Sequence, residues 1–387
     1  MRTFEFRLYP TKDQQVTLLR HLDICRQLYN HILESLNTAR TNGEKHDWNW
    51  TSAMIPQWKR STFPQFKEVY SKVAQMTNDT LWDNIKSLSA LKKKGFRVGR
   101  LRFKGQGWYN TLNYNQSGFK IDYDHKKIEF SKIGIINAKI HRQINGKVKG
   151  IIIKHTSTDQ WYACIQCDTE SVLLPRTGKS VGIDLGVSKF AHDSDNHIIE
   201  NPKYMQQSLA KLKTLQRSVS RKKKGSSNRR KAKFKLTKLH AHIVNQRKDH
   251  LHKASSYYIK NYDTICVEKL NIKPLTRKGK SKTLHRNILD AGWGLFFQYL
   301  SYKAQSAGRQ LIKVPPQYTS QNCSQCGTRV PKELSDRLHV CPHCGYIADR
   351  DYNASLNIKK RGLEQTSLLM ESRPTPLLIT SSGESGR

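Results

Sequence analysis

The first recognisable pattern lies in the segment TFEFRLY (residues 3–9), where apolar and polar side chains alternate. This period of two is typical of a half-buried strand. Pro10 ends the segment, because proline cannot donate a ladder hydrogen bond. Thr11 followed three residues later by Gln14 is the capping-box pattern that opens a helix. The chain is therefore expected to begin with a strand and to pass directly into a helix.

Helical spacing of apolar residues dominates residues 11–92. One stripe comes first, and a second stripe runs to about Leu91 after a connection over residues 47–64. The apolar positions of the two stripes are Val16, Leu19, Leu22, Leu28, Ile32, Leu36, Val69, Val73, Leu81, Trp82, Ile85 and Leu88. The pattern predicts a small helical domain whose exposed basic and aromatic residues grip a duplex; a plain helical bundle explains the stripes equally well.

From Phe96 to about Thr177 the pattern changes to short alternating segments separated by turn residues. The predicted strands are FRVGRLRFKG, TLNYNQSGFKID, KKIEFSKIG, KVKGIIIKHT and QWYACIQCD. Many short strands at close spacing indicate a small antiparallel barrel or sandwich. The opening strand is expected to pair into this sheet, so that the helical region becomes an insertion.

A different pattern begins near Lys179. VGIDLGVSKFA predicts a buried strand interrupted by Asp184, and YDTICVEKL predicts another that ends in Glu268. Between them, residues 205–260 carry helical apolar stripes in two halves, joined by the basic tip RKKKGSSNRRKAKFK. An amphipathic helix over residues 289–307 and a strand over QLIKV follow. Alternating strands and helices of this kind indicate an α/β domain.

Charge narrows the class of partner. The 387 residues contain 68 Lys and Arg against 30 Asp and Glu, a formal charge of +38. A chain this basic repels itself unless a polyanion neutralises it, and nucleic acid is the usual polyanion. No apolar run approaches the ~20 residues that span a bilayer, and the start of the chain lacks the apolar core of a signal peptide. A membrane partner is therefore not expected.

Four of the eight cysteines form two C-x-x-C pairs, Cys323/Cys326 and Cys341/Cys344, with fourteen residues between the pairs. Two such turns can direct four thiolates at one tetrahedral ion. This spacing predicts a structural Zn²⁺ site with Cys323, Cys326, Cys341 and Cys344 as its ligands.

The other four cysteines lie in apolar segments and are interpreted as small core residues. Cys164 and Cys167 form a third C-x-x-C, but it lies within a predicted strand and has no second pair nearby. Thiols without a secretion signal fit a reducing cytoplasm better than a disulfide framework. The expected location is the cytoplasm, in association with the nucleoid of a prokaryotic host.

Three acidic residues are candidates for chemistry. Asp184 interrupts an apolar strand, which costs several kcal/mol unless the charge is paired or holds a metal, of order 2–7 kcal/mol even for a neutral polar group. Glu268 closes the second apolar strand, and Asp351 begins the helical pattern DYNASLNI. Each also has an ordinary explanation, since a strand-end Glu is commonly solvated and an Asp before a helix is commonly a cap.

Taken together, the three acids suit phosphodiester hydrolysis by two Mg²⁺ ions, with Mn²⁺ as an expected substitute. Mg²⁺ prefers oxygen ligands, so two or three carboxylates suffice to hold a pair of ions roughly 4 Å apart. Asp184, Glu268 and Asp351 are thus predicted to be both the catalytic and the Mg²⁺-binding residues. An Asp on a first strand, a Glu on a later strand and an Asp on a final helix is the order of an RNase H-like α/β fold.

The order of motifs resembles the TnpB family, the OrfB-type proteins of insertion sequences that are related to type V CRISPR nucleases. The matching segments are EFRLYPTKDQ, LYNHILE, GIDLGV, the basic hairpin, VEKLN, YTSQNCSQCG, CPHCG and ADRDYNASLNI. The resemblance covers about residues 1–360. It implies that Asp184, Glu268 and Asp351 form a RuvC-type triad beside four zinc ligands, with Asp349 as a helper or a cap.

The resemblance implies a multidomain α+β protein: a RuvC nuclease domain with a zinc-ribbon insertion, a wedge-like β-barrel and an inserted helical recognition domain. The expected ranges are 1–10 and 93–178 for the barrel, 11–92 for the helical domain, 179–315 and 346–362 for the nuclease domain, 316–345 for the ribbon and 363–387 for a disordered tail.

The resemblance further implies an RNA-guided DNA endonuclease of a transposable element. Its partners would be a guide RNA from the element end and a double-stranded DNA target next to a short flanking motif. A strand-transferring transposase could use the same three acids, and a catalytically silent, guide-directed repressor or a zinc-ribbon RNA-binding protein would need none of them. The sequence leaves monomer and dimer equally open.

Overall fold

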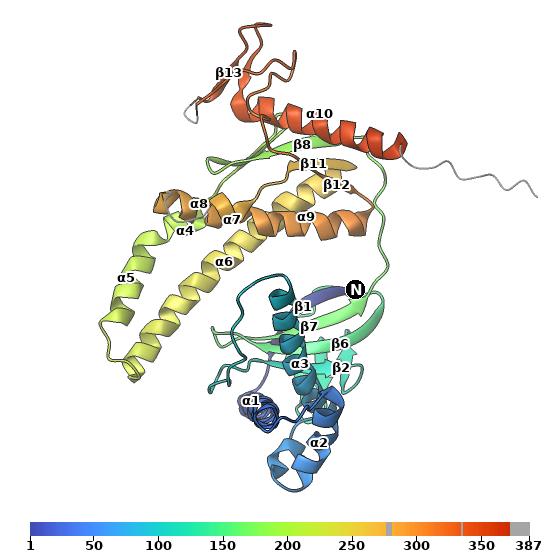
Figure 1. Cartoon of the computed structure of the whole chain (residues 1–387), viewed down its shortest axis with the longest axis vertical. Coiled ribbons are helices and arrows are strands. Elements are labelled where there is room, and N and C mark those ends of the chain that lie inside the picture. The colour runs from blue at the N-terminus through green and yellow to red at the C-terminus, as the bar shows by residue number, and fades with distance from the viewer. Residues whose placement is uncertain (276–280, 334–335, 372–387) are drawn as a thin grey trace, which may run out of the picture. The chain divides into compact units, whose positions relative to one another are not determined.

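The computed structural model describes residues 1–275, 281–333 and 336–371 (Figure 1). The chain divides into two compact units, residues 1–170 and 171–387, each with a hydrophobic core of its own. None of the described helices combines the length and the apolar character that crossing a bilayer requires.

The first unit is built on a seven-stranded antiparallel sheet in the order β2-β6-β7-β1-β5-β4-β3. The predicted antiparallel β-domain is therefore confirmed, but the described ladder does not join the edge strands β2 and β3, so the sheet is a half-barrel. Its strands are β1 Arg2–Tyr9, β2 Thr111–Asn115, β3 Phe119–Asp122, β4 Lys127–Phe130, β5 Gly134–Ala138, β6 Lys147–His155 and β7 Trp161–Asp168.

The opening strand pairs into this sheet as expected. Along most of its length β1 runs antiparallel to β7, with Phe6 opposite Ala163, and its end pairs with β5. Because β1 pairs with β7, the last strand of the unit, all the residues between these two strands belong to the same unit. The helices that follow β1 are therefore an insertion between the first and second strands of one sheet.

Three helices fill that insertion: α1 Lys12–Thr41, α2 Trp48–Arg60 and α3 Ser71–Lys93. The predicted capping box is confirmed, because Thr11 Oγ1 accepts from Gln14 N–H while the Gln14 side chain accepts from Thr11 N–H. The three helices pack into one continuous core with the sheet. The predicted connection over residues 47–64 is wrong, since Asp47 caps α2 there and the helix continues through Pro56.

The predicted strand at FRVGRLRFKG is also wrong: residues 96–105 form irregular backbone. Among the described residues, no strand pairs with this segment; the Asn30 side chain forms hydrogen bonds with its backbone instead. Asn30 Oδ1 accepts from Lys104 N–H at 2.8 Å and its Nδ2 donates to the Lys104 carbonyl at 3.0 Å. Phe96 and Phe103 stay exposed on this segment.

The second unit is built on a five-stranded mixed sheet in the order β10-β9-β8-β11-β12. Strands β8, β11 and β12 are parallel to one another, whereas β9 and β10 are antiparallel to their neighbours. The strands are β8 Ser180–Leu185, β9 Lys189–Asp193, β10 Ile198–Glu200, β11 Thr264–Glu268 and β12 Gln310–Val314.

Helices cover both faces of this sheet (Figure 1). Ile265 and Val267 of β11 face α6 and α9 in the large core, while Cys266 faces α10 in a smaller one. The helices are α4 Tyr204–Gln207, α5 Leu209–Ser220, α6 Ser227–Asn261, α7 Ile272–Leu275, α8 Lys282–Ala291, α9 Trp293–Ala307 and α10 Arg350–Glu371. A small hairpin of β13 Leu338–Val340 and β14 Ile347–Asp349 precedes α10.

Three predictions for this unit need correction. VGIDLGVSKFA is not one strand but the hairpin β8–β9, which turns at Gly186, whose N–H donates to the Phe190 carbonyl. The helix predicted over residues 289–307 is interrupted at Gly292, which separates α8 from α9. The tail predicted to be disordered from residue 363 remains helical to Glu371, and its residues 372–387 lie outside the described part of the chain.

Helix α10 lies directly against the backbone of the sheet. A Cβ atom on Gly182 of β8 would lie 2.1 Å from the Ser355 carbonyl oxygen and 2.5 Å from Lys359 N. A Cβ atom on Gly362 of α10 would lie 2.2 Å from the Cys266 Sγ of β11. Two glycines, one on each partner, thus permit the close approach that joins the end of the chain to the sheet.

Replacing Gly182 by alanine should therefore destabilise the second unit. The new methyl group meets backbone atoms, which cannot rotate away as a side chain does, so we expect a loss of about 1–3 kcal/mol or more in the free energy of unfolding. Urea unfolding measures it. Gly99→Ala is the matched control, because a Cβ atom there has no neighbour within 4 Å. Equal stability of the two variants would contradict the close packing of α10.

Candidate functional site

The two strand acids lie on the face of the sheet that α10 covers. Side chains two apart in a strand share a face, so Asp184 faces the same way as Gly182, and Glu268 the same way as Cys266. The parallel register pairs Ile183 with Val267, which brings the next residues, Asp184 and Glu268, side by side at the carboxyl ends of β8 and β11.

Asp351 enters the site from the first turn of α10. The helix is capped by Asp349, whose Oδ1 accepts from Asp351 N–H at 2.8 Å and from Tyr352 N–H at 3.2 Å. Burial works against ionisation of Asp349, but hydrogen bonds from Lys189 and the helix backbone hold its pKa below the usual value. The cap alternative for Asp349 is therefore confirmed, and Asp351 lies inside the helix rather than at its cap.

The structure brings the three predicted acids close enough to act on one another electrostatically. Burial raises the pKa of Asp184 well above its usual value, and the negative charges of Glu268 and Asp351 raise it further. Burial also raises the pKa of Glu268, although a hydrogen bond from Thr319 Oγ1 and the charge of Arg361 oppose the rise. A bound cation would favour the ionised forms of these acids, because opposite charge lowers the pKa of a carboxyl group.

The donor atoms of this cluster fit a hard divalent cation. Carboxylate oxygens are the preferred ligands of Mg²⁺, and burial raises the pKa of both Asp184 and Glu268, so a bound cation would stabilise their ionised forms. The catalytic role of Asp184, Glu268 and Asp351 stays a prediction, and the residues that would hold the ions are the same three.

The four predicted zinc ligands form a compact cluster in the segment between β12 and α10. Their sulfur atoms all lie within 4.8 Å of one another, with Cys323 and Cys344 3.7 Å apart and Cys326 and Cys341 3.6 Å apart. Zn–S bonds of about 2.3 Å in a tetrahedron require sulfurs roughly 3.8 Å apart, so the cluster fits Zn²⁺ without rearrangement.

The cysteine cluster is tied to α10 by two buried asparagines. Asn353 Oδ1 accepts from Ser324 N–H inside the first C-x-x-C turn at 2.9 Å, and its Nδ2 donates to the Asn322 carbonyl at 2.8 Å. Asn357 donates to the carbonyls of Thr319 and Asn322. The motif DYNASLN thus anchors the cysteine cluster to the helix that carries Asp351.

Three sequence models match the chain. One described as "Probable transposase" matches residues 164–278, one described as "Cas12f1-like, TNB domain" matches 293–358, and one described as "Helix-turn-helix domain" matches 1–45. InsQ of Escherichia coli (strain K12), provisionally named an RNA-guided DNA endonuclease, is 32% identical over 379 residues, which cover 94% of this chain and 92% of InsQ. The chain belongs to the TnpB family.

Another relative of this TnpB protein, from Streptomyces pristinaespiralis and provisionally named in the same way, is 31% identical over 94% of this chain and 89% of its own length. Among solved structures, a Cas12f1–sgRNA–target DNA complex aligns with a TM-score of 0.54 at 15% identity, over 89% of this chain and 82% of the Cas12f1 chain. At that identity the likeness concerns the fold alone. Residues 1–45 of this TnpB protein form β1 and the single long helix α1, not two helices joined by a turn.

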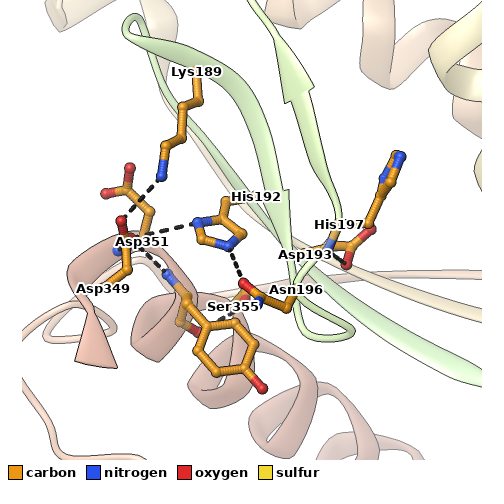
Figure 2. Close-up of polar contacts among 9 residues, drawn as sticks. Lys189, His192, Asp193, Asn196, His197, Asp349, Asp351 and Ser355 are labelled. Carbon is orange, nitrogen blue, oxygen red and sulfur yellow. Dashed lines mark hydrogen bonds and ion pairs between the residues drawn. The ribbon is translucent and has the colours of Figure 1, made fainter. Parts of the chain in front are cut away.

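The sequence did not single out two residues that the structure places beside the TnpB acids, His192 and Lys189 of β9 (Figure 2). His192 pairs directly opposite Asp184 across the β8–β9 hairpin, and Lys189 Nζ donates to Asp349 Oδ2 at 3.0 Å. Had residues 186–188 been recognised as a hairpin turn, the period of two would have placed His192 on the same face as Asp184.

The third C-x-x-C pair does not form a metal site. Cys164 and Cys167 are three residues apart in β7, so their side chains point to opposite faces of the sheet. Cys167 is buried in the core, whereas Cys164 Sγ lies beside Glu5. Burial raises the pKa of the Cys164 thiol to about 11, which further disfavours metal binding there.

Cys344→Ser should remove the zinc. The variant retains three thiolates, so we expect the zinc content to fall from about one ion per chain toward zero, with partial unfolding of the segment that anchors α10. Elemental analysis of the purified protein measures the metal. Cys164→Ser is the control and should keep its zinc; loss of zinc from both variants, or from neither, would remove these four residues as ligands.

The raised pKa of Asp184 predicts how stability depends on pH. Because the folded protein binds this proton more tightly than the unfolded chain, the metal-free protein loses stability as pH rises above about 3.8, the ordinary Asp value. Asp184→Asn removes the ionisation, so it should raise the melting temperature of metal-free protein at neutral pH and have little effect at low pH. Glu200→Gln, at an exposed position, should change neither. A destabilised Asp184→Asn protein at neutral pH would contradict the assignment.

Proposed function

We propose that this TnpB protein is an RNA-guided DNA endonuclease of a transposable element that cleaves guide-complementary DNA next to a short flanking motif. The observation that carries the proposal is the row of Asp184 and Glu268 at the carboxyl ends of adjacent strands, with Asp351 brought to the same face by α10. Two full-length relatives provisionally named for this activity support it.

The second unit has the arrangement of an RNase H-like, RuvC-type nuclease domain. A central parallel pair, β8 and β11, carries the two strand acids, the antiparallel hairpin β9–β10 extends one edge, and helices lie on both faces. The cysteine cluster interrupts this domain just before its last helix. The half-barrel and the inserted helices of the first unit correspond to the proposed wedge-like and recognition domains, whose boundaries stay predictions.

The three acids would bind two Mg²⁺ ions, or Mn²⁺ in their place. Bound ions of this kind activate water and stabilise the leaving 3′ oxygen of a phosphodiester. The protein's own task is to hold the carboxylates in position. Thr319 donates to Glu268 and fixes its orientation, and the Asp349 cap fixes the helix turn that carries Asp351. No histidine or lysine base is required for this hydrolysis.

The high positive charge of the chain favours nucleic acid as its partner. The hairpin of α5 and α6 exposes a dense set of cations while its apolar seam, including Leu212, Val219 and Leu236, is buried between the two helices. The exposed cations around its tip are Lys211, Lys213, Arg217, Arg221, Lys223, Lys224, Arg230, Lys231, Lys233 and Lys235. Contacts from such cations go to phosphates and are independent of base sequence, which suits a structured guide RNA and its heteroduplex with DNA.

The first unit adds an exposed segment that combines charge with aromatic rings. In residues 96–108, the side chains of Phe96, Phe103 and Trp108 are 58%, 56% and 77% exposed, and arginines 97, 100 and 102 are exposed between them. Exposed rings among cations suit stacking of unpaired bases. This surface supports the proposal of an RNA or single-stranded DNA partner.

Two alternatives use the same site differently. A strand-transferring transposase would join donor and target DNA without any RNA, and a silent repressor would bind guided DNA without cutting it. Burial and the charges of Glu268 and Asp351 raise the pKa of Asp184, a perturbation that is typical of functional sites and so favours an active enzyme over a silent repressor. Monomer or dimer, and the cytoplasmic, nucleoid-associated location, stay predictions.

The proposal is tested by purifying the protein with its RNA, sequencing that RNA, and offering a DNA library that contains the complementary sequence. In Mg²⁺ the wild-type complex should cut double-stranded target beside one flanking motif. Asp184→Ala should reduce the cleavage rate by on the order of 10³-fold or more while RNA and target affinity change little, since it removes cation binding and not phosphate contacts.

Glu200→Gln serves as the control and should cut at the wild-type rate. Full cleavage by Asp184→Ala would reject the proposed site, and RNA-independent joining of DNA ends would favour the transposase. Guided binding with no cleavage in either Mg²⁺ or Mn²⁺ would establish the repressor.

A further inference from the structure

His192 lies in the row of side chains that contains the candidate acids, although no part of the proposed mechanism uses it. It pairs across the β8–β9 hairpin with Asp184, so the two side chains lie next to each other on the face covered by α10. The residue is only 2% exposed. A buried polar ring in such a position requires partners for both of its nitrogens.

Among the described residues, only Nε2 of His192 has a hydrogen-bond partner. Nε2 lies 2.9 Å from Asn196 Oδ1, an acceptor, so the tautomer that makes this hydrogen bond carries its hydrogen on Nε2. In the neutral ring Nδ1 is then a bare lone pair. It is buried, has no hydrogen bond, and points at Asp349 Oδ1 at a distance of 3.4 Å (Figure 2). In this tautomer two acceptors face each other, the buried imidazole lone pair and an oxygen of the Asp349 carboxylate, which is 39% exposed.

A third potential ligand lies at the same place. One donor atom each of His192, Asp349 and Asp351 lie within 4.8 Å of one another. Among the residues the structure describes, the Asp351 carboxylate accepts no hydrogen bond, whereas Asp349 Oδ1 already accepts from the first turn of α10. A cation between these groups would satisfy the imidazole lone pair and offset both carboxylates.

Lys189 indicates where positive charge is accommodated. Its Nζ lies 3.0 Å from Asp349 Oδ2, the oxygen that the helix turn leaves available. The Lys189 side chain is 27% exposed and flexible, so it can withdraw toward solvent when another cation takes its place. The Lys189 ammonium group thus lies where a bound cation would contact Asp349.

We propose that His192 Nδ1 together with Asp351 and Asp349 Oδ2 forms a nitrogen-containing position for a divalent cation at the β9 side of the candidate site. The inference rests on the proposed function in taking Asp351 as a cation ligand. An imidazole ligand favours transition ions such as Mn²⁺ or Co²⁺ over Mg²⁺, which prefers an all-oxygen shell. The position therefore gives this protein a preference among divalent cations that three carboxylates alone would not provide.

Mn²⁺ is the probe, and pulsed electron paramagnetic resonance of the full-length protein with its co-purified RNA is the measurement. A directly bound imidazole nitrogen gives ¹⁴N modulation of the Mn²⁺ signal. We expect this modulation in the wild-type protein and its loss in His192→Gln. The matched control is His197→Gln in the turn between β9 and β10, whose ring stacks on Tyr257 and lies 3.4 Å from Asp193 Oδ2. The control should retain the modulation.

Titration calorimetry supplies the second measurement. His192→Gln should weaken Mn²⁺ binding by roughly 10-fold or more while changing Mg²⁺ binding far less. Lys189→Met should tighten Mn²⁺ binding and retain the nitrogen signal, because it removes the competing ammonium. Modulation that persists in His192→Gln, or Mn²⁺ binding that weakens in Lys189→Met, would overturn the inference.

The two proposals fail in different ways. If Asp184→Asn abolishes Mn²⁺ binding but the wild-type signal carries no ¹⁴N modulation, the cation site of the proposed function stands and the His192 ligand is rejected. If Mn²⁺ binding to the complex does not depend on Asp184 at all, the proposed catalytic site itself is rejected, and the nitrogen ligand with it. Zinc content should stay unchanged in every variant, since the cysteine cluster is intact.

Discussion

The contact between helix α10 and the central sheet is the constraint on which the second unit depends. Side chains normally separate a helix from a sheet, but here Gly182 and Gly362 allow backbone to approach backbone and Cys266. Asp349 caps helix α10 and Asp351 lies in its first turn, so the same contact determines where Asp351 lies relative to Asp184 and Glu268. An acid from residue 351 can act with acids from residues 184 and 268 only because this interface leaves no room for side chains.

Packing brings the acidic side chains of the site together, and their electrostatic repulsion opposes that packing. Burial of Asp184, together with the charges of Glu268 and Asp351, raises the pKa of Asp184, so the folded, metal-free protein loses stability as the pH rises above the ordinary Asp value. A hydrogen bond from Thr319 and the charge of Arg361 stabilise the ionised form of Glu268, and Lys189 stabilises the ionised form of Asp349. These groups offset only part of the negative charge. The remainder is the physical reason that the site favours cations.

The sequence predicted elements well where local and long-range preferences agree. The strand before Pro10, the capping box at Thr11 and the strands that carry Asp184 and Glu268 all have patterns that tertiary contacts reinforce. Errors occurred where a pattern lacked its partner. Residues 96–105 alternate like a strand, but Asn30 binds their backbone in place of a neighbouring strand.

The acidic residues of the candidate site could be predicted from the sequence, but the residues beside them could not. The sequence alone identifies Asp184, Glu268 and Asp351, because a charged residue in or beside an apolar segment is easily recognised there. His192 follows Asp184 by eight residues, directly after the segment VGIDLGVSKFA that the pattern predicts as one strand. Its position opposite Asp184 depends on the turn at Gly186, and a turn inside an apolar run gives little signal in the sequence.

The cysteine cluster has a mechanical relation to the acids. Thr319 bonds to Glu268, Ser324 lies within the first C-x-x-C turn, and Asn353 and Asn357 of α10 bind the backbone between them. One short stretch of chain therefore orients an acid of the sheet and also anchors the helix that carries Asp351. An ion bound by the four cysteines would rigidify this stretch, because it constrains the turn to which α10 is attached. Zinc would then act on the proposed chemistry indirectly, by holding Asp351 and Glu268 in position relative to each other.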